Sequence, residues 1–156
     1  MRSFWERKIV RPIIGLLKQG ITPHKIALGL ALGIVLGIFP VIGMTTLLCT
    51  VAAFLFRVNL PAIQVANYLV APLQLALLLP FYRAGEWLFH APHLPLSVKE
   101  IAALVEKDMF GAMTFLWDTT LHAVVAWTLV APVLVFLLYH LFKPALHKLT
   151  LRSAPA

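Results

Sequence analysis

Polar groups beside broken apolar backbone are the part of this chain whose residue types and spacing could do chemistry. The 31-residue run 26–56 contains no charged side chain, and the sequence GIFPVIG at residues 37–43 interrupts it. Proline removes a helix donor, and glycine bends cheaply, so backbone N–H and C=O groups should be freed there. In transporters, half-helices that end at such a break bind anionic substrate groups and coupling cations.

Side chains around the break extend this constellation. Hydroxyls follow it directly, amides lie around Pro72 in the next apolar segment, and arginines at segment ends could pair with phosphate. The predicted substrate-binding residues are Pro40, Gly43, Thr45, Thr46, Arg57, Asn67, Gln74 and Arg83. Amides in hydrocarbon need partners and should face the helix bundle. The alternative is that prolines are simply common in membrane helices and that the amides only tie helices together.

Two other pairs of residues are candidate sites. His90 and His93 stand in a proline-rich loop without a nearby cysteine or a convincing carboxylate, so we expect no metal there. Asp118 and His122 share a helix face and could relay protons, but an acid near a helix N-terminus is the simpler interpretation. No nucleophile motif stands beside either pair. The sequence therefore predicts neither an enzyme nor a cofactor.

The elements that must position these residues are membrane helices. The chain is 61% hydrophobic and only 12% charged, against roughly 25% charged residues in a soluble domain, and about 20 apolar residues span a bilayer. We predict an all-α, small polytopic membrane protein with one helical membrane domain, residues 21–145. Its segments are expected at about 23–56, 62–80 and 113–142, with a surface helix at about 97–110.

Charge predicts the orientation. Residues 1–25 carry six basic side chains against one acidic, and residues 143–156 carry three against none. The basic residues flank apolar spans, so the positive-inside rule explains them better than nucleic-acid binding does, and both termini should be cytoplasmic in a bacterial inner membrane. Residues 1–20 are expected to form a basic amphipathic helix, either bound to anionic headgroups or covering the bundle, and residues 146–156 a basic cytoplasmic tail.

Three simple spans would leave the termini on opposite sides, so an even number of crossings is expected. Either residues 26–56 form a re-entrant helix–break–helix hairpin, or each half crosses with help from tilt and thinning of the bilayer. The spacing of Gly29, Gly33 and Gly37 predicts close helix packing, within one chain or in a homo-oligomer.

Several motifs, taken in order, resemble a known family. They are TP at 22–23, IALGLALG at 26–33, GIFPVIG at 37–43, RVNLP at 57–61, and Asn67 followed by APLQ at 71–74. This order resembles the bacterial domain-of-unknown-function family 2062, closely over residues 20–90 and loosely beyond. Many members carry asparagine at position 71 and threonine at position 74. The resemblance implies an integral inner-membrane protein. Some relatives are joined to glycosyltransferase domains, which suggests a role with glycolipids or polymers of the cell envelope.

These observations lead to two functional hypotheses. The first is a small transporter or binder of an anionic or lipid-linked envelope substrate, which would need the break and its amides. The second is a non-catalytic membrane scaffold or accessory subunit for an envelope glycosyltransferase, which would need a partner and an exposed face.

Overall fold

The computed structural model describes residues 22–95 and 97–153. Six α-helices and no strand lie within these residues: α3 (Pro23–Gly37), α4 (Thr45–Leu55), α5 (Leu60–Leu69), α6 (Ala71–Phe89), α7 (Val98–Lys107) and α8 (Met109–Ser153). The all-α prediction is confirmed. The expected amphipathic helix of residues 1–20 lies outside the described part of the chain.

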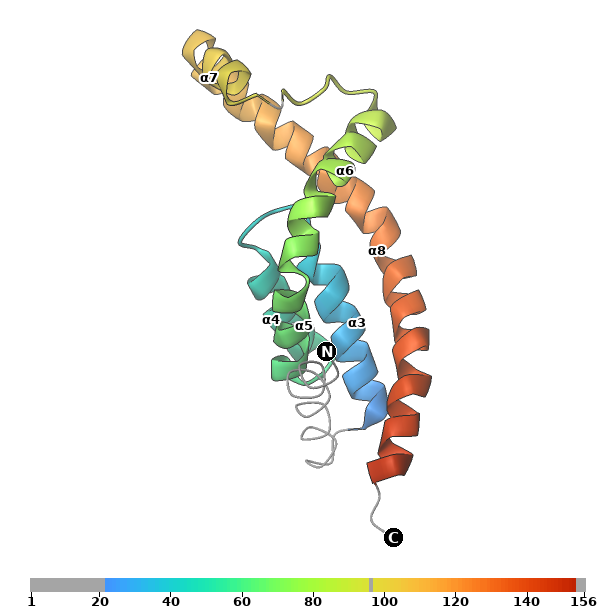
Figure 1. The fold of residues 1–156 in the computed structure, drawn as a ribbon. Coiled ribbons are helices and arrows are strands. Elements are labelled where there is room, and N and C mark those ends of the chain that lie inside the picture. The colour runs from blue at the N-terminus through green and yellow to red at the C-terminus, as the bar shows by residue number, and fades with distance from the viewer. Residues whose placement is uncertain (1–21, 96, 154–156) are drawn as a thin grey trace.

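Helix α3 is the centre of the bundle and contacts α4, α5 and α8. Thr22 is its N-cap and Pro23 its first residue, in agreement with the expected start of the segment at about residue 23. Figure 1 shows α4 running back beside α3, and α5 and α6 then leading away toward the opposite end of the molecule. The start of α3, the α4–α5 turn and the end of α8 therefore lie at one end, which we call the base, and α7 lies at the other.

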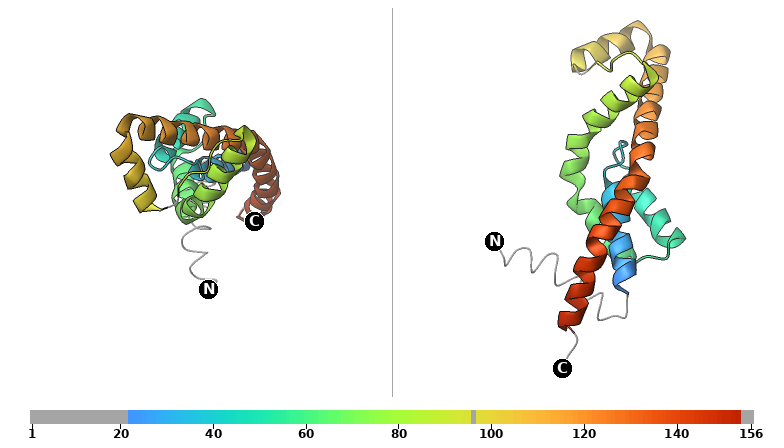
Figure 2. Two further views of the ribbon diagram at one scale, coloured as in Figure 1. Left: turned by 90° about the horizontal axis from the view of Figure 1, so that it is seen from above. Right: turned by 90° about the vertical axis from the view of Figure 1, so that its right-hand side faces the viewer.

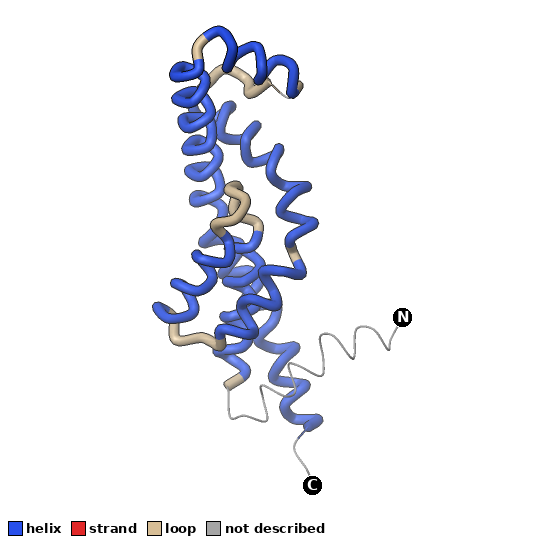
Figure 3. Tube along the Cα trace, turned by 90° about the vertical axis from the view of Figure 1, so that its left-hand side faces the viewer, coloured by secondary structure: helices blue, strands red, loops and turns tan. Residues whose placement is uncertain are grey.

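The predicted break separates α3 from α4, and Figure 3 shows it as a loop about halfway along the molecule. Pro40 has no N–H and cannot continue α3, and the Phe39 N–H turns back to the Leu36 carbonyl oxygen at 3.2 Å. Gly43 has a φ of 89°, a left-handed conformation that favours glycine. The helix–break–helix prediction for the first segment is confirmed.

The glycine stripe packs against α5 of the same chain. A Cβ added at Gly33 would lie 2.4 Å from the Ile63 carbonyl oxygen, and one at Gly37 would lie 2.5 Å from a methyl group of Val70. The two helix backbones approach this closely because glycine has no side chain. The stripe thus packs within one chain, and the homo-oligomer stays a prediction.

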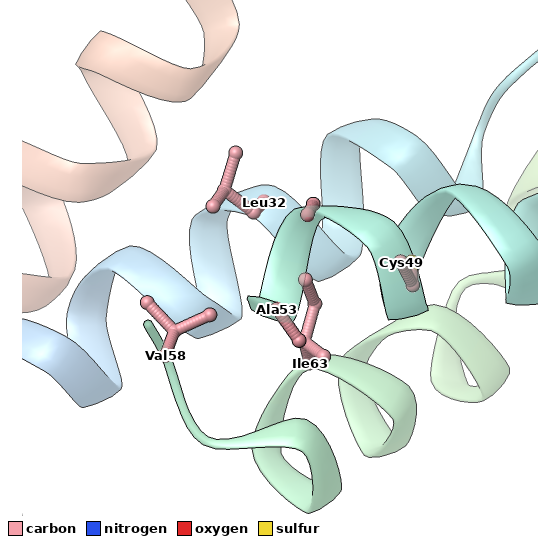
Figure 4. Packing of buried hydrophobic residues seen from close by; sticks show 6 residues of the cluster. Leu32, Cys49, Ala53, Val58 and Ile63 are labelled. Carbon is pink, nitrogen blue, oxygen red and sulfur yellow. The ribbon is translucent and has the colours of Figure 1, made fainter. Parts of the chain in front are cut away.

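A small apolar cluster joins α3, α4 and α5. Figure 4 shows its members Leu32, Cys49, Ala53, Val58 and Ile63 where these helices meet. Ala53 and Ile63 are buried in this cluster, so α4 is held against the first half of the second segment. The hairpin and α5 therefore pack as one unit.

The second predicted segment is two helices and not one. Helices α5 and α6 meet at Val70 with a bend of 65°. Pro72 stands in the first turn of α6, where its missing N–H costs nothing. Pro80 does not close the segment at residue 80 as expected, because α6 continues through it to Phe89.

The last predicted segment is longer than expected at both ends. Asp108 Oδ1 accepts hydrogen bonds from the N–H groups of Phe110 and Gly111 at 3.1 and 3.0 Å, and so caps α8 at its start. The surface helix α7 ends at Lys107, a little short of the expected residue 110, and Gly111 lies inside α8. Pro144 does not stop α8, and residues 146–153 continue it instead of forming a separate tail.

Length and hydropathy identify one described helix that could cross a membrane, the portion Met109–Lys148 of α8. The bent pair α5 and α6 would be a second crossing if it is counted as one broken span. Helices α3 and α4 are apolar but shorter.

The glycine contacts lead to a matched pair of substitutions. Gly33→Ala should lower the free energy of unfolding by about 1–3 kcal/mol, because the new methyl group meets backbone that cannot move alone. Gly29→Ala should change it by less than about 1 kcal/mol, since its nearest neighbour lies at 3.7 Å. Thermal unfolding in detergent measures both, and equal stability of the two variants would contradict the close α3–α5 contact.

Candidate functional site

The backbone carbonyls freed by the break are met by side chains from two other helices. The Val35 carbonyl is released because the Phe39 N–H bonds to Leu36, and it accepts a hydrogen bond from Trp127 Nε1 at 3.2 Å. The Phe39 carbonyl accepts one from Gln74 Nε2 at 2.9 Å. Helices α8 and α6 thus supply the donors that α3 lost.

Apolar packing surrounds these two hydrogen bonds. Pro40 is fully buried, and Ile38 and Val35 are nearly so. The ring of Phe39 meets the ring of Trp127 edge-on, with centroids 4.9 Å apart. A hydrogen bond shielded from water is costly to break, so the break is held in one conformation.

A second polar group ties α5 to the start of α4. Asn67 Nδ2 donates to Gln64 Oε1, and Gln64 Nε2 donates to the Thr46 carbonyl oxygen and to Thr50 Oγ1, each at 3.1 Å. The Thr50 hydroxyl donates to the same Thr46 carbonyl at 2.8 Å. Asn67 is only 3% exposed and also adjoins Gly37. We call Gln64, Asn67 and Gln74 the amide network.

The structure brings together most of the residues predicted from the sequence. Pro40, Asn67 and Gln74 are buried around the break, and Thr45 is buried at the first position of α4. Thr46 contributes its backbone carbonyl. Gly43 is exposed, and the space that a Cβ would enter is empty.

The two predicted arginines do not join this group. Arg57 is exposed in the α4–α5 turn at the base, with a φ of 51°. Arg83 lies on α6, between the break and the opposite end, and its Nη1 is 2.7 Å from Glu86 Oε2. The structure therefore does not form a single site that combines both arginines with the break.

Glu86 holds the loop that follows α6. The residue is 2% exposed. Its carboxylate accepts a hydrogen bond from the Leu94 N–H at 2.6 Å, and His93 Nδ1 lies 2.7 Å from the other oxygen. His93 thus has a local structural partner. Among the described residues no group of three or more His, Cys, Asp or Glu could hold a metal ion.

The second candidate pair, Asp118 and His122, does not form a proton relay. The ring of His122 stacks on Phe89 with centroids 4.3 Å apart, and its buried Nδ1 makes no hydrogen bond in the described structure. Asp118 is exposed. No described hydrogen bond or ion pair joins the two side chains.

Two residues important to the break were not among those predicted. Gln64 is a polar amide in an apolar segment, and it connects Asn67 to α4. Trp127 lies deep in an apolar stretch, whereas tryptophan usually marks the ends of membrane spans. A tryptophan this far from the ends of a span is the sequence feature that could have indicated its role at the break.

These contacts predict how the break responds to loss of one donor. Gln74→Leu or Trp127→Phe should each cost about 1–3 kcal/mol of unfolding free energy by leaving a buried carbonyl unpaired. Hydrogen exchange of residues 36–46, followed by mass spectrometry, should accelerate in both. Thr128→Val is the matched control, because that hydroxyl bonds only within α8. Unchanged exchange in both variants would contradict the assigned hydrogen bonds.

The comparisons with known proteins identify a family but no individual relative. The sequence model of the family described as "Uncharacterized protein conserved in bacteria (DUF2062)" matches residues 8–154. No curated protein and no solved structure matches the chain significantly. The matched residues cover nearly the whole chain, so the chain belongs to this bacterial family.

Proposed function

We propose that this family member is an integral protein of the bacterial inner membrane that binds and carries a small or lipid-linked anionic substrate. The observation that carries the proposal is the break itself, where two interrupted apolar segments meet. Gln74 of the bent pair α5–α6 donates to the Phe39 carbonyl at the tip of the α3–α4 hairpin. Two interrupted helices that meet in this way are typical of transporter sites.

The membrane location rests on α8. Between Asp118 and Lys143 it carries no charged residue, and at 1.5 Å per residue this stretch is about 36 Å long, enough for the ~30 Å hydrocarbon core. Leu129, Val133 and Leu137 point outward, each more than half exposed. Lipid is the environment that favours such a surface, since soluble monomers rarely expose wide apolar patches.

The lengths of α3 and α4 favour the re-entrant alternative. Their 15 and 11 residues extend about 22 and 16 Å, and the hairpin starts and ends at the base (Figure 1). Its break contacts Trp127, which lies about 13 Å along α8 from Asp118. The proposed crossings are therefore α8 and the bent pair, an even number, with Lys25, Arg57 and Lys143 on the cytoplasmic side.

The substrate would meet the hairpin at its polar tip. We assign binding to Pro40, Gly43, Thr45, Thr46, Asn67 and Gln74, with Arg57 and Arg83 nearer the two membrane faces. Gly43 is exposed beside open space, and Thr46, in the first turn of α4, is exposed as well. In a transport cycle an anion could take the hydrogen bonds that Gln74 and Gln64 now donate to backbone.

One observation favours the second hypothesis, a scaffold for an envelope glycosyltransferase. Each amide of the network already donates to another group within the chain, as a purely structural network would. A scaffold would keep its function when these amides are replaced by apolar residues that preserve folding, whereas a carrier would not.

Cysteine labelling tests the proposed topology. With Cys49 replaced, single cysteines at Ser3, Arg57 and Ser153 should be shielded from an impermeant thiol reagent in intact cells, while one at Ser97 should react. The even number of crossings requires this pattern, and reaction at only one of the two termini would contradict it. Labelling after permeabilisation is the control that each cysteine is accessible.

Repair of the break tests the function. Substituting Pro40 and Gly43 together by leucine should let the helix continue, so that its backbone groups bond to one another. Retained ligand, identified by mass spectrometry of the purified protein, should fall while membrane abundance holds or rises, because two helix breakers are gone. Leu47→Ile, at an exposed position of α4, is a conservative control. Full ligand retention in the double variant would show that the break serves packing alone.

A further inference from the structure

We propose that a phosphate-bearing lipid binds along the α3–α8 face, with one apolar chain in a groove and its headgroup in a basic pocket at the base. This site adjoins the break and shares Val35 and Trp127 with it, but it contains none of the predicted substrate-binding residues. It deepens the proposed function by naming the class of anionic lipid and where it binds. It rests on the proposed membrane location.

The groove has a volume of about 540 Å³ and lies between α3 and α8, bordered by the end of α4. Its lining is almost entirely apolar and includes Leu28, Leu36, Phe56, Val135 and Phe136. Clefts of this size hold ligands of a few hundred Å³. The lining residues Val35 and Trp127 also form the break's hydrogen bond, so the groove runs from the base toward the hairpin tip.

The pocket at the base has a volume of about 490 Å³. It is lined by Thr22, Pro23, His24, His140, Lys143, Pro144 and His147. The lining includes a lysine, three imidazole rings and a threonine hydroxyl, and none of these seven residues is acidic. An ammonium group together with N–H and O–H donors is the chemistry that binds a phosphate.

Tyr139 joins the groove to the pocket. Its ring lines the groove, and its hydroxyl is 2.5 Å from His24 Nδ1 in the pocket. Lys143 Nζ lies 5.7 Å from the centre of the same ring, and His140 packs on Phe136 with centroids 4.1 Å apart. The apolar groove and the basic pocket therefore adjoin at Tyr139 and His24.

The charge of the two cavities and their proposed depth in the membrane together select the occupant. The apolar part adjoins the uncharged stretch of α8, and the basic part begins at Lys143, the first charge after it. A phosphorylated lipid has this same order of parts, with its chain in hydrocarbon and its phosphate at the cytoplasmic interface, where basic residues attract anionic headgroups. A free anion would leave the groove unused.

Photolabelling tests the site. The full chain is placed in phosphatidylcholine nanodiscs with a phosphatidic acid analogue that carries a diazirine in the middle of one chain. Adducts should map to α3 and α8 peptides that line the groove. Unlabelled phosphatidic acid should compete, and inorganic phosphate or extra phosphatidylcholine should not. Competition by inorganic phosphate alone would show a site for a free anion and overturn the lipid assignment.

Matched variants assign the two parts. Lys143→Gln should weaken labelling by about tenfold, and Lys143→Arg should retain it. Lys148→Gln, on the same helix but outside the lining, should not change it. Val135→Trp should block the groove, whereas Val133→Trp, two residues away and outward-facing, should not. Thermal unfolding checks that each variant is folded. Equal labelling in Lys143→Gln and Lys148→Gln would overturn the headgroup pocket.

A photoreactive amino acid at Val135 tests other occupants in whole cells. The expected adduct is a lipid that carries phosphate. Capture of residues 1–21 of the same chain, or of a second copy, would overturn the proposal. Lipid adducts confined to the predicted substrate-binding residues around the break would also overturn this site, but they would leave the proposed function standing. If no lipid adduct forms and alkali extracts the protein from membranes, as it does a peripheral protein, both this site and the proposed function are contradicted.

Discussion

Broken backbone in apolar surroundings must find hydrogen-bond partners, and the arrangement of this molecule follows from that constraint. Where Pro40 ends α3, the carbonyls of Val35 and Phe39 lose their helical donors. An unpaired buried carbonyl costs free energy comparable to a lost hydrogen bond, and in lipid no water could supply one. Trp127 and Gln74 supply the donors from two different helices.

This requirement explains why α3 is central. Gln74 can reach the break only if α6 begins beside it, and the bend at Val70 places α6 there. α5 must in turn lie against α3, which Gly33 and Gly37 permit by offering no side chain. The amide network then fixes the start of α4 to α5 through Gln64. The same packing leaves a groove of about 540 Å³ between α3 and α8, next to the break.

The sequence predicted the features that depend on local chemistry. Thr22 and Pro23 start α3, the break follows Gly37, and the small-residue stripe packs a helix, each through rules that involve only neighbouring residues. The errors came where tertiary contacts decided. Segments were expected to end at about residues 80 and 142, but α6 and α8 continue through Pro80 and Pro144, since a helix can continue past an internal proline with a kink. Trp127 could not be assigned to the break, because its partner Val35 is 92 residues away.

The central claim is that the hairpin enters and leaves the membrane from one side, with its tip held at depth by Trp127 and Gln74. Depth measurement by power-saturation electron paramagnetic resonance tests it most directly, with spin labels at Ile42, Phe56 and Trp87 of the otherwise cysteine-free protein in nanodiscs. We expect the label at Ile42 to lie within the hydrocarbon core, accessible to oxygen and shielded from a water-soluble nickel reagent, between the levels of the other two. A label at Ile42 that is as accessible to the nickel reagent as the label at Trp87 would show two full crossings and contradict the re-entrant hairpin.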